Sequence, residues 1–228
     1  MEIIFTSPLS ASKNMELSWD LLNSLKSNPR PILHFYNWEK PSATYGYFTD
    51  PIQFLNLKGL EDNGIELARR PTGGGILFHL TDIAFAFLLP ANHPRYSINT
   101  LENYEVVNGV ILNALQKKMG KGAFLMEEGR ALDKASQHFC MAKPTRYDLI
   151  IDGRKVAGGA QRRIQGGYLH QGSIHLKALP QPILDAVLVP GTCVAEAMRQ
   201  NAAPDLMIEW EEFKEILTHS FREAFPAR

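Results

Sequence analysis

The sequence predicts an α+β fold, a single catalytic-type domain in which a mixed, largely antiparallel sheet is flanked by helices. Segments with helical spacing of apolar residues alternate with short strand-like segments along the 228 residues. Residues 146–152 and 154–163 flank Asp152 and Gly153, and such an Asp-Gly pair is a strong hairpin signal. No repeat or low-complexity linker divides the chain, so we expect one domain over 1–228.

Strand-like segments recur along the chain and are rich in β-branched and aromatic residues. They are 2–7, 32–38, 42–47, 65–70, 76–79, 82–89, 146–152, 154–163 and 167–176. Residues 127–145 are polar and irregular, which predicts a loop between the longest helix and the hairpin.

Helices are predicted where apolar residues fall on one face at helical spacing. Residues 12–26 and the tail around 210–217 show this pattern. Asp50 followed by Pro51 is typical of a helix start, so we expect a short helix from there to near Gly64.

The longest helical pattern spans residues 100–119. Thr100 is the expected N-cap, and Gly120 is the expected end of the helix. Lys117 and Lys118 in the last turn complement the helix dipole.

Composition excludes several classes of protein. The 24 basic and 24 acidic residues cancel, which argues against DNA or an anionic membrane as partner. The N-terminus has no secretory pattern, and no apolar stretch approaches the length of a membrane span. Cys140 and Cys193 have no metal or redox spacing, and the histidines are scattered. We therefore expect a cytoplasmic protein with reduced thiols and no metal site, in which Cys193 is structural.

The stretch RRPTGGGILFH, residues 69–79, places two arginines and three glycines before an apolar run. It lacks the Gly-Lys-Ser/Thr of a P-loop and the helix that follows a dinucleotide fingerprint. Glycine N–H groups can bind an anion or a polar ligand, and arginine suits phosphate or carboxylate. The alternative is a tight glycine turn with two solvated arginines, and this stretch alone leaves both open.

A second stretch, DGRKVAGGAQRR, places Lys155 after the Asp-Gly turn and before a run of alanine and glycine. Such a lysine can reach into a narrow space and donate to an oxygen that gains charge in a transition state. The alternative is a solvated strand lysine. In GGYLHQGSI, His170 and Gln171 lie between apolar neighbours, where a histidine is more often structural than catalytic.

Taken in order, LARRPTGGGILFH, GRKVAGGAQRR and LHQGSI resemble the lipoate–protein ligase family, within the biotin/lipoate ligase and octanoyltransferase superfamily. SATYGYFTDP at 42–51 also resembles an early segment of that family, and the resemblance covers roughly residues 10–180. It implies a biotin/lipoate-ligase-like catalytic domain that joins lipoate to AMP, using ATP and Mg²⁺, and then acylates one lysine of a lipoyl domain. The acceptors implied are lipoyl domains of 2-oxoacid dehydrogenase complexes or the glycine cleavage H protein.

The resemblance also implies the site residues. Those that line the acyl-adenylate pocket would be Arg69, Arg70, Thr72, Gly73, Gly74, Gly75 and His79. Lys155 would contact the phosphate and the acyl carbonyl, while Gly158 and Gly159 leave room for the acyl chain and Gln161 stays near the nucleotide. Once the adenylate is held near the amine, no nucleophilic side chain is required.

Two departures from the family pattern stand out. Many members have Asp after the motif histidine, where this chain has Leu80 and then Asp82. The chain also ends soon after its last helix, so we expect no C-terminal accessory domain, and a separate accessory subunit could supply that role.

Cys140 supports an alternative chemistry. CMAKPTRYDLIIDGRK is similar to the C-F-x-x-P-S-x-Y-E segment of cysteine-dependent octanoyltransferases, which take octanoate from acyl carrier protein without ATP. A thiolate favoured by cations such as Arg146 and Lys155 would be the nucleophile. Otherwise Cys140 is an inert small residue.

The third glycine favours the ligase, because those transferases commonly have T-G-G-R where Gly75 stands here. We therefore place the ATP-dependent ligase first and the octanoyltransferase second. A non-catalytic subunit that binds lipoyl-AMP or a lipoyl domain is a further alternative. Biotin ligation fits less well, because Arg69-Arg70 and GGAQRR resemble the lipoate branch and no helix-turn-helix precedes the domain.

Overall fold

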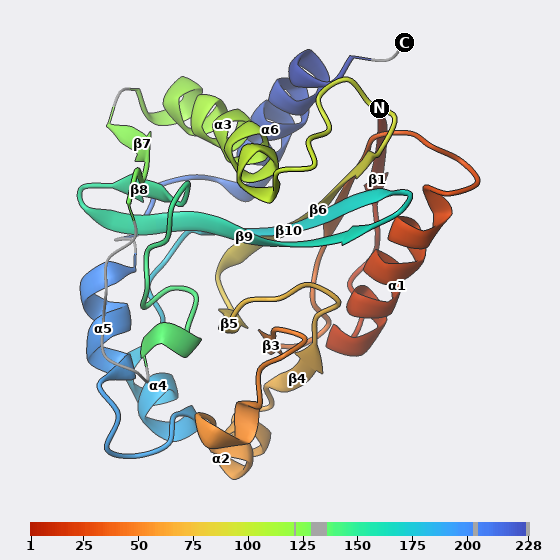
Figure 1. Ribbon diagram of the computed structural model, residues 1–228. Helices are drawn as coiled ribbons and strands as arrows, with labels where there is room; N and C mark the ends of the chain where they lie inside the picture. The colour runs from red at the N-terminus through yellow and green to blue at the C-terminus, as the bar shows by residue number, and fades with distance from the viewer. Residues whose placement is uncertain (121, 129–135, 203–204, 227–228) are drawn as a thin grey trace.

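The computed structural model describes residues 1–228 except 121, 129–135, 203–204 and 227–228. In this part of the chain, a seven-stranded sheet has the order β1-β2-β6-β10-β9-β8-β7 (Figure 1). Its strands are β1 (Glu2–Phe5), β2 (Ile32–Tyr36), β6 (Asp82–Pro90), β10 (Gly167–His175), β9 (Arg154–Ile164), β8 (Leu149–Ile151) and β7 (Ala123–Leu125). Neighbouring strands are antiparallel except β1 and β2, which confirms the predicted class of sheet.

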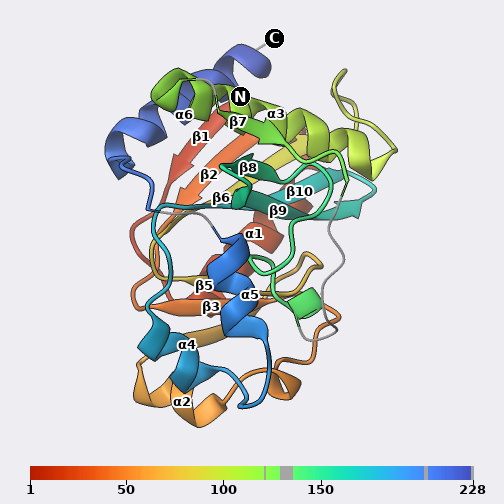
Figure 2. The same ribbon diagram turned by 90° about the vertical axis from the view of Figure 1, so that its left-hand side faces the viewer.

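A second, three-stranded sheet lies below the first (Figure 2). Its order is β4-β3-β5, with β4 (Glu66–Arg69), β3 (Ser42–Tyr45) and β5 (Ile76–His79). The helices α2 (Leu57–Asp62), α4 (Gln181–Val187) and α5 (Val194–Asn201) contribute to the apolar cluster around this sheet. The sequence patterns did not separate these strands into a sheet of their own.

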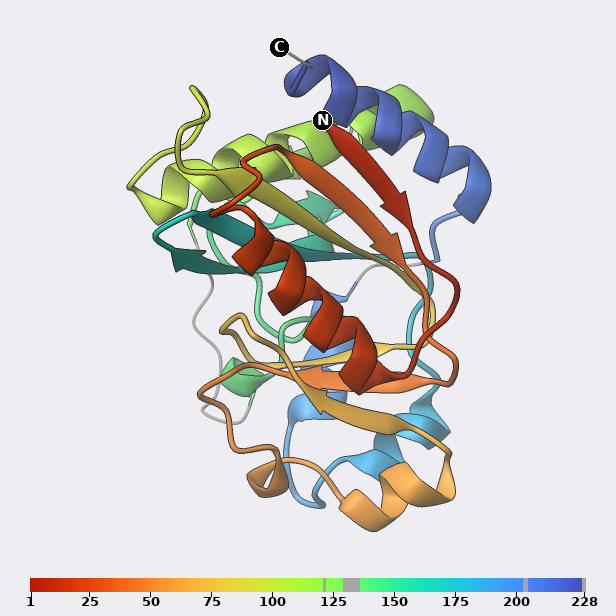
Figure 3. The same cartoon turned by 90° about the vertical axis from the view of Figure 1, so that its right-hand side faces the viewer.

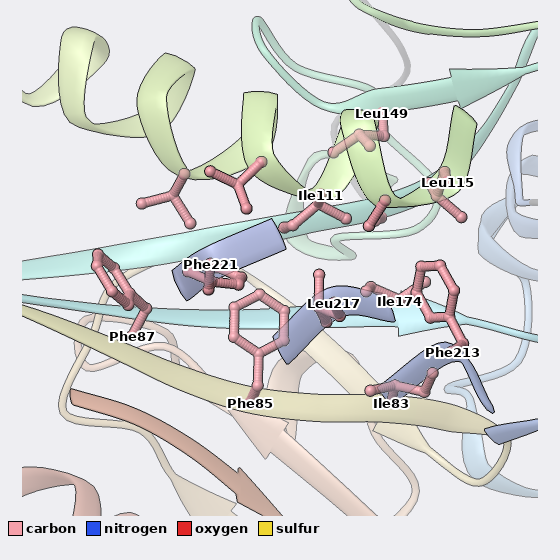
Figure 4. Close-up of a cluster of buried hydrophobic side chains, with 14 of the residues drawn as sticks. Ile83, Phe85, Phe87, Ile111, Leu115, Leu149, Ile174, Phe213, Leu217 and Phe221 are labelled. Carbon is pink, nitrogen blue, oxygen red and sulfur yellow. The ribbon is translucent and has the colours of Figure 1, made fainter. Parts of the chain in front are cut away.

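The helices α3 (Thr100–Met119) and α6 (Trp210–Ala224) cover one face of the large sheet, and α1 (Ala11–Ser24) packs against the other (Figures 1 and 3). Successive side chains of β6 point to opposite faces of the sheet and pack against different helices. Phe85 and Phe87 point into the cluster with α3 and α6 (Figure 4). Ala84 and Ala86 pack with residues of α1 on the other face. Burying a phenylalanine side chain in this way stabilises the fold by roughly 2–3 kcal/mol.

The helix ends follow local capping chemistry, with two departures from expectation. The bounds Thr100–Met119 are those predicted, but the cap is Asn99, whose side chain accepts from the Leu101 N–H at 3.0 Å. Asp50 caps only a 3₁₀ turn, Pro51–Gln53, and the helix restarts at Leu57 after an Asn56 cap. The interruption places Leu55, which is buried, opposite Leu188 in an isolated bridge.

The observed secondary structure also differs from the predicted one in segments where the apolar residues show no clear periodicity. Strand β7 and the helices α4 and α5 have no counterpart among the predicted elements. Of the predicted loop 127–145, residues 129–135 lie outside the described part. Its later part holds the 3₁₀ turn Ser136–His138 and buries Phe139 and Met141, because that segment packs against β5. Among the described helices, none combines the length and the apolar character that crossing a bilayer requires.

Three histidines of the large sheet are buried in the neutral form. Burial lowers the pKa of His34 to about 4, of His170 to about 3 and of His175 to about 4. In the unfolded chain these groups titrate near 6.5. Between these values the unfolded chain binds more protons than the folded one, so the free energy of unfolding decreases as the pH falls.

Acidification from pH 7.5 to pH 5 is therefore expected to reduce the free energy of unfolding by at least about 2 kcal/mol. Urea titrations at the two pH values, followed by tryptophan fluorescence, measure this change. The variant His170→Gln should show a smaller pH effect, whereas His219→Gln, on the exposed face of α6, should keep the wild-type effect. Equal urea midpoints at both pH values for the wild type would contradict the prediction.

Candidate active site

A cavity of about 410 Å³ lies between the two sheets. Its wall combines β5, β9, β10, the glycine loop at 73–75, the first turns of α3 and the segment 137–148. The predicted site residues that line it are Arg70, Gly73, Gly74, Gly75, His79, Cys140, Lys155, Gly158, Gly159 and Gln161. Arg69 and Thr72 do not line it: Arg69 is exposed over the Tyr47 ring, and Thr72 is buried and donates to Gln171 at 2.7 Å.

Arg70 organises the glycine loop. Its buried guanidinium donates to the carbonyls of Gly73 and Gly75 at 3.1 and 2.7 Å, and to both oxygens of Thr44. Arg70 therefore uses most of its donors within the protein, rather than as the free bidentate ligand expected of a motif arginine.

The N–H groups of the glycine loop differ from its carbonyls in their hydrogen bonding. Thr49 Oγ1 holds the Gly74 carbonyl at 2.9 Å, so all three loop carbonyls have partners. Within the described part of the chain, no acceptor pairs with the N–H groups of Gly73, Gly74 or Gly75. These three donors in the cavity wall are available to an acyl oxygen or a phosphate.

Gly75 has a role that the sequence did not reveal. A Cβ there would lie 2.1 Å from the carbonyl oxygen of His138, which is backbone of the segment that leads to Cys140. Cys140 N–H in turn donates to the Ile76 carbonyl at 2.9 Å. The atoms that require a glycine at position 75 therefore belong to the protein backbone. Gly75 does not by itself indicate a nucleotide phosphate.

The variant Gly75→Ala should displace the Cys140 segment. We expect a loss of about 1–3 kcal/mol of stability, because the added Cβ would overlap the His138 carbonyl. Gly73→Ala is the matched control, since its Cβ would meet nothing within 4 Å, and its stability should stay within about 0.5 kcal/mol of wild type. Thermal unfolding of the two variants checks the contrast, and equal melting temperatures would refute it.

Cys140 lies in the cavity wall, half-buried, with its sulfur 4.0 Å from Arg70 Nη2. Of the cations expected near the thiol, Lys155 donates to the Cys140 carbonyl at 2.9 Å. Arg146 also lines the cavity and lies over the Tyr147 ring at 4.9 Å. The structure adds Arg70, which the sequence did not single out for this purpose, as a cation in contact with the sulfur. Cys193 is exposed at the N-terminus of α5.

Lys155 forms a buried ion pair that the sequence did not predict. Its Nζ lies 2.7 Å from Asp148 Oδ2, which also accepts from the Thr145 N–H and hydroxyl at 2.6 and 2.8 Å. A Cβ at Gly158 would lie 2.5 Å from Asp148 and 2.9 Å from Lys155 Nζ. Gly158 thus makes room for this pair, in addition to lining the cavity.

The far wall of the cavity holds a second polar group. His79 bonds Thr44 Oγ1 at 2.8 Å through Nε2 and Asp82 at 2.7 Å through Nδ1, and Ser173 also donates to Asp82. Burial alone would raise the pKa of Asp82, but His79 and Ser173 hold it below its usual value. Asp82 therefore pairs with His79, although it does not directly follow this histidine in the sequence as the Asp of many family members does.

His170 lies behind the cavity wall rather than in it. Its ring packs beneath Gly159, where a Cβ would come within 2.2 Å of Nε2, and its Nδ1 bonds the Gln161 amide at 3.0 Å. Tyr104 of α3 meets this ring edge-on and lines the cavity. Buried and neutral, His170 supports Gln161 and the floor of the site, which agrees with a structural role.

Asp148 and Tyr104 are two of the lining residues that sequence reasoning missed, and Met15, Tyr36, Lys143, Thr145 and Ser173 are others. Asp148 immediately precedes the strand that pairs with the Lys155 strand, with Ile150 opposite Lys155, and this proximity was the available signal. Tyr104 gave no signal, because α3 reaches the cavity only through the tertiary fold. The described residues contain no group of three or more His, Cys, Asp or Glu placed to hold a metal ion.

Comparison with known proteins places this arrangement in a family. An octanoyltransferase LipM of Halalkalibacterium halodurans is 30% identical over 225 residues, covering 92% of this chain and 81% of that protein. The LipM of Bacillus subtilis is 29% identical over 228 residues, covering 95% and 81%. A bi-partite lipoate protein ligase of Thermoplasma acidophilum shares the fold at a TM-score of 0.71 and 23% identity, covering 98% of this chain and 83% of that one.

A lipoate-protein ligase A bound with ATP has a TM-score of 0.72 at 24% identity, covering 98% of this chain and 85% of that one. Both structures support the biotin/lipoate-ligase-like fold. The family model described as the lipoyl protein ligase A/B catalytic domain matches residues 10–222. The chain therefore belongs to the lipoyl protein ligase A/B catalytic domain family.

Proposed function

We propose that this protein is a cysteine-dependent octanoyltransferase that moves an octanoyl group from a carrier-bound thioester to a lysine of a lipoyl domain. The observation that carries the proposal is the position of Cys140, whose sulfur lies 4.0 Å from Arg70 Nη2 in the wall of the cavity that Gly73, Gly74 and Gly75 also line. The relatives named octanoyltransferase LipM, about 30% identical over most of the chain, support the same choice.

The chemistry follows from these positions. The Cys140 thiolate attacks the acyl carbonyl, the carbon–sulfur bond of the donor breaks, and the carrier thiolate leaves and takes up a proton. The acceptor lysine, as a neutral amine, then attacks the new thioester and loses a proton as the amide forms, which frees Cys140. In both steps the carbonyl oxygen gains charge, and the glycine N–H groups and Lys155 are the donors available to it.

Two cations lie next to Cys140. Arg70 Nη2 lies 4.0 Å from its sulfur, and the Lys155 ammonium donates to its carbonyl. Both are held by other contacts, Arg70 by the glycine carbonyls and Lys155 by Asp148, so they need little reorganisation when charge develops. Asp148 offsets part of the Lys155 charge, whereas no carboxylate in the described part of the chain forms an ion pair with Arg70.

The ATP-dependent lipoate–protein ligase is the second candidate. The same glycine N–H groups and Lys155 fit a phosphate as well as an acyl oxygen, and a lipoate-protein ligase A that shares the fold was solved with ATP. In that reaction ATP and Mg²⁺ would supply the activated acyl group, and Cys140 would have no covalent role. A lipoyl domain is the acceptor in either case, and a lipoate ligase of this fold was studied with its E2 lipoyl domain.

Intact-mass spectrometry of a lipoyl domain separates these candidates. One reaction contains octanoyl-acyl carrier protein without ATP, and the other contains lipoate, ATP and Mg²⁺. The proposal expects octanoylation in the first only, with a hydroxylamine-sensitive octanoyl adduct on Cys140 in the absence of acceptor. Modification in the second reaction only would establish the ligase. No modification in either, with tight binding of the lipoyl domain, would establish a non-catalytic subunit.

A further inference from the structure

A surface of arginine and aromatic side chains adjoins the opening of the cavity. Exposed lining residues such as Gly74 and Leu101 mark that opening. The turn after β3 reaches it, because Thr49 Oγ1 donates to the Gly74 carbonyl and Tyr47 N–H donates to the Thr72 carbonyl at 2.9 Å. Side chains of this turn therefore lie beside any molecule that enters the site.

Cation–π contacts build one side of this surface. The Arg162 guanidinium lies 5.2 Å from the Tyr47 ring and 5.9 Å from the Trp19 ring, and Arg69 lies 4.7 Å from Tyr47. Phe48 meets Tyr47 edge-on at 5.1 Å and is 85% exposed. These residues come from α1, β4, β9 and the turn after β3, so the fold brings them together.

Arg163 follows Arg162 in β9, so its side chain lies on the other face of the strand, toward α3. Its Nη1 donates to the Ile98 carbonyl, and the Ile98 side chain, 81% exposed, precedes Leu101 by three residues. We call Arg69, Arg162, Arg163, Tyr47, Phe48 and Ile98 the arginine rim.

The charge of the arginine rim is not balanced locally. Among the described residues no carboxylate forms an ion pair with Arg69, Arg162 or Arg163, whereas Arg30 and Arg199 are both paired. The three arginines are a local concentration of positive charge, to which Glu102, hydrogen-bonded to Ser97 and Asn99 on either side of Ile98, adds one negative charge. Arginine and aromatic residues together with exposed apolar groups are also typical of protein–protein contact surfaces.

We propose that the arginine rim docks the acidic face of the acyl-carrier domain that presents the octanoyl thioester. This inference rests on the proposed transferase function. A carrier that holds its acyl chain on a phosphodiester-linked thiol arm brings negative charge to the rim. An acceptor brings a lysine ammonium, which three arginines repel. Phe48 and Ile98 would be covered by the docked carrier.

Charge reversal tests the proposal. The variant Arg162→Glu/Arg163→Glu should raise the KM for octanoyl-acyl carrier protein, and its Kd measured by fluorescence anisotropy of labelled carrier, by at least about tenfold at low salt. The wild-type kcat/KM should fall steeply with added salt, and the variant should lose that dependence. Lys40→Glu/Arg222→Glu is the matched control, with two reversals at exposed positions on the loop before β3 and on α6.

A small octanoyl thioester without a carrier supplies the second readout. Its rate of Cys140 acylation should be equal in the wild type and both double variants, which also verifies folding. The inference is overturned if the carrier Kd is the same in all three proteins, or if only the lipoyl-domain KM rises, which would assign the rim to the acceptor. If neither thioester acylates Cys140 while the carrier Kd still shifts, the docking stands and the proposed function fails.

Discussion

Cys140→Ala is expected to lose octanoyl transfer by at least about 1,000-fold, which is the scale on which removal of a covalent nucleophile acts. The glycine N–H groups and Lys155 would remain, so a low rate of direct aminolysis should persist. The measurement is the initial rate of lipoyl-domain octanoylation by intact mass, with octanoyl-acyl carrier protein as donor.

Cys193→Ala is the matched control, because Cys193 is exposed on α5 and does not line the cavity. It should retain wild-type rates. Both variants should unfold within about 1 kcal/mol of wild type, since neither removes a large buried group. An unchanged transfer rate in Cys140→Ala, or an ATP-dependent lipoylation indifferent to it, would overturn the transferase.

Local sequence patterns predicted several elements of the fold correctly. The pattern over 100–119 gave the bounds of α3, because amphipathic spacing and a terminal glycine are local properties. The Asp152-Gly153 turn has positive φ at both residues, as the hairpin signal requires, and β9 and β10 follow as predicted. Strand β9 delivers Lys155, Gly158, Gly159 and Gln161 to the cavity, so this part of the predicted site follows from a local signal.

The remaining features depend on long-range contacts. No periodicity marks residues 136–145, which are held by the Cys140–Ile76 hydrogen bond and by packing on Gly75. That Arg70 lies at the Cys140 sulfur, 70 positions away in the chain, also depends on the tertiary fold. The predicted link between Gly75 and a nucleotide has no support in the fold, because the backbone that approaches Gly75 is the His138 carbonyl, 63 positions away in the chain.

Asp148→Ala is expected to destabilise the protein by about 3–5 kcal/mol, because it leaves the buried Lys155 ammonium without its partner. The Thr145 hydroxyl and N–H would also lose their acceptor, which loosens the segment after Cys140. Urea unfolding measures the loss. Asp62→Ala is the control, since its pair with Lys58 is exposed on α2 and should be worth less than about 1 kcal/mol.

The double variant Asp148→Leu/Lys155→Met distinguishes folding from chemistry. A buried ion pair replaced by apolar side chains of similar size is often neutral for stability, so the double variant should regain most of the free energy lost in Asp148→Ala. Octanoyl transfer should nevertheless stay at least about 100-fold below wild type, because the donor to the acyl oxygen is gone. A stable but inactive double variant assigns the Asp148–Lys155 pair to the reaction rather than to folding alone, since Asp148→Leu also removes the acceptor of Thr145. A stable and active one would reduce the pair to a packing element and leave the glycine N–H groups and Arg70 as the groups that stabilise the developing charge.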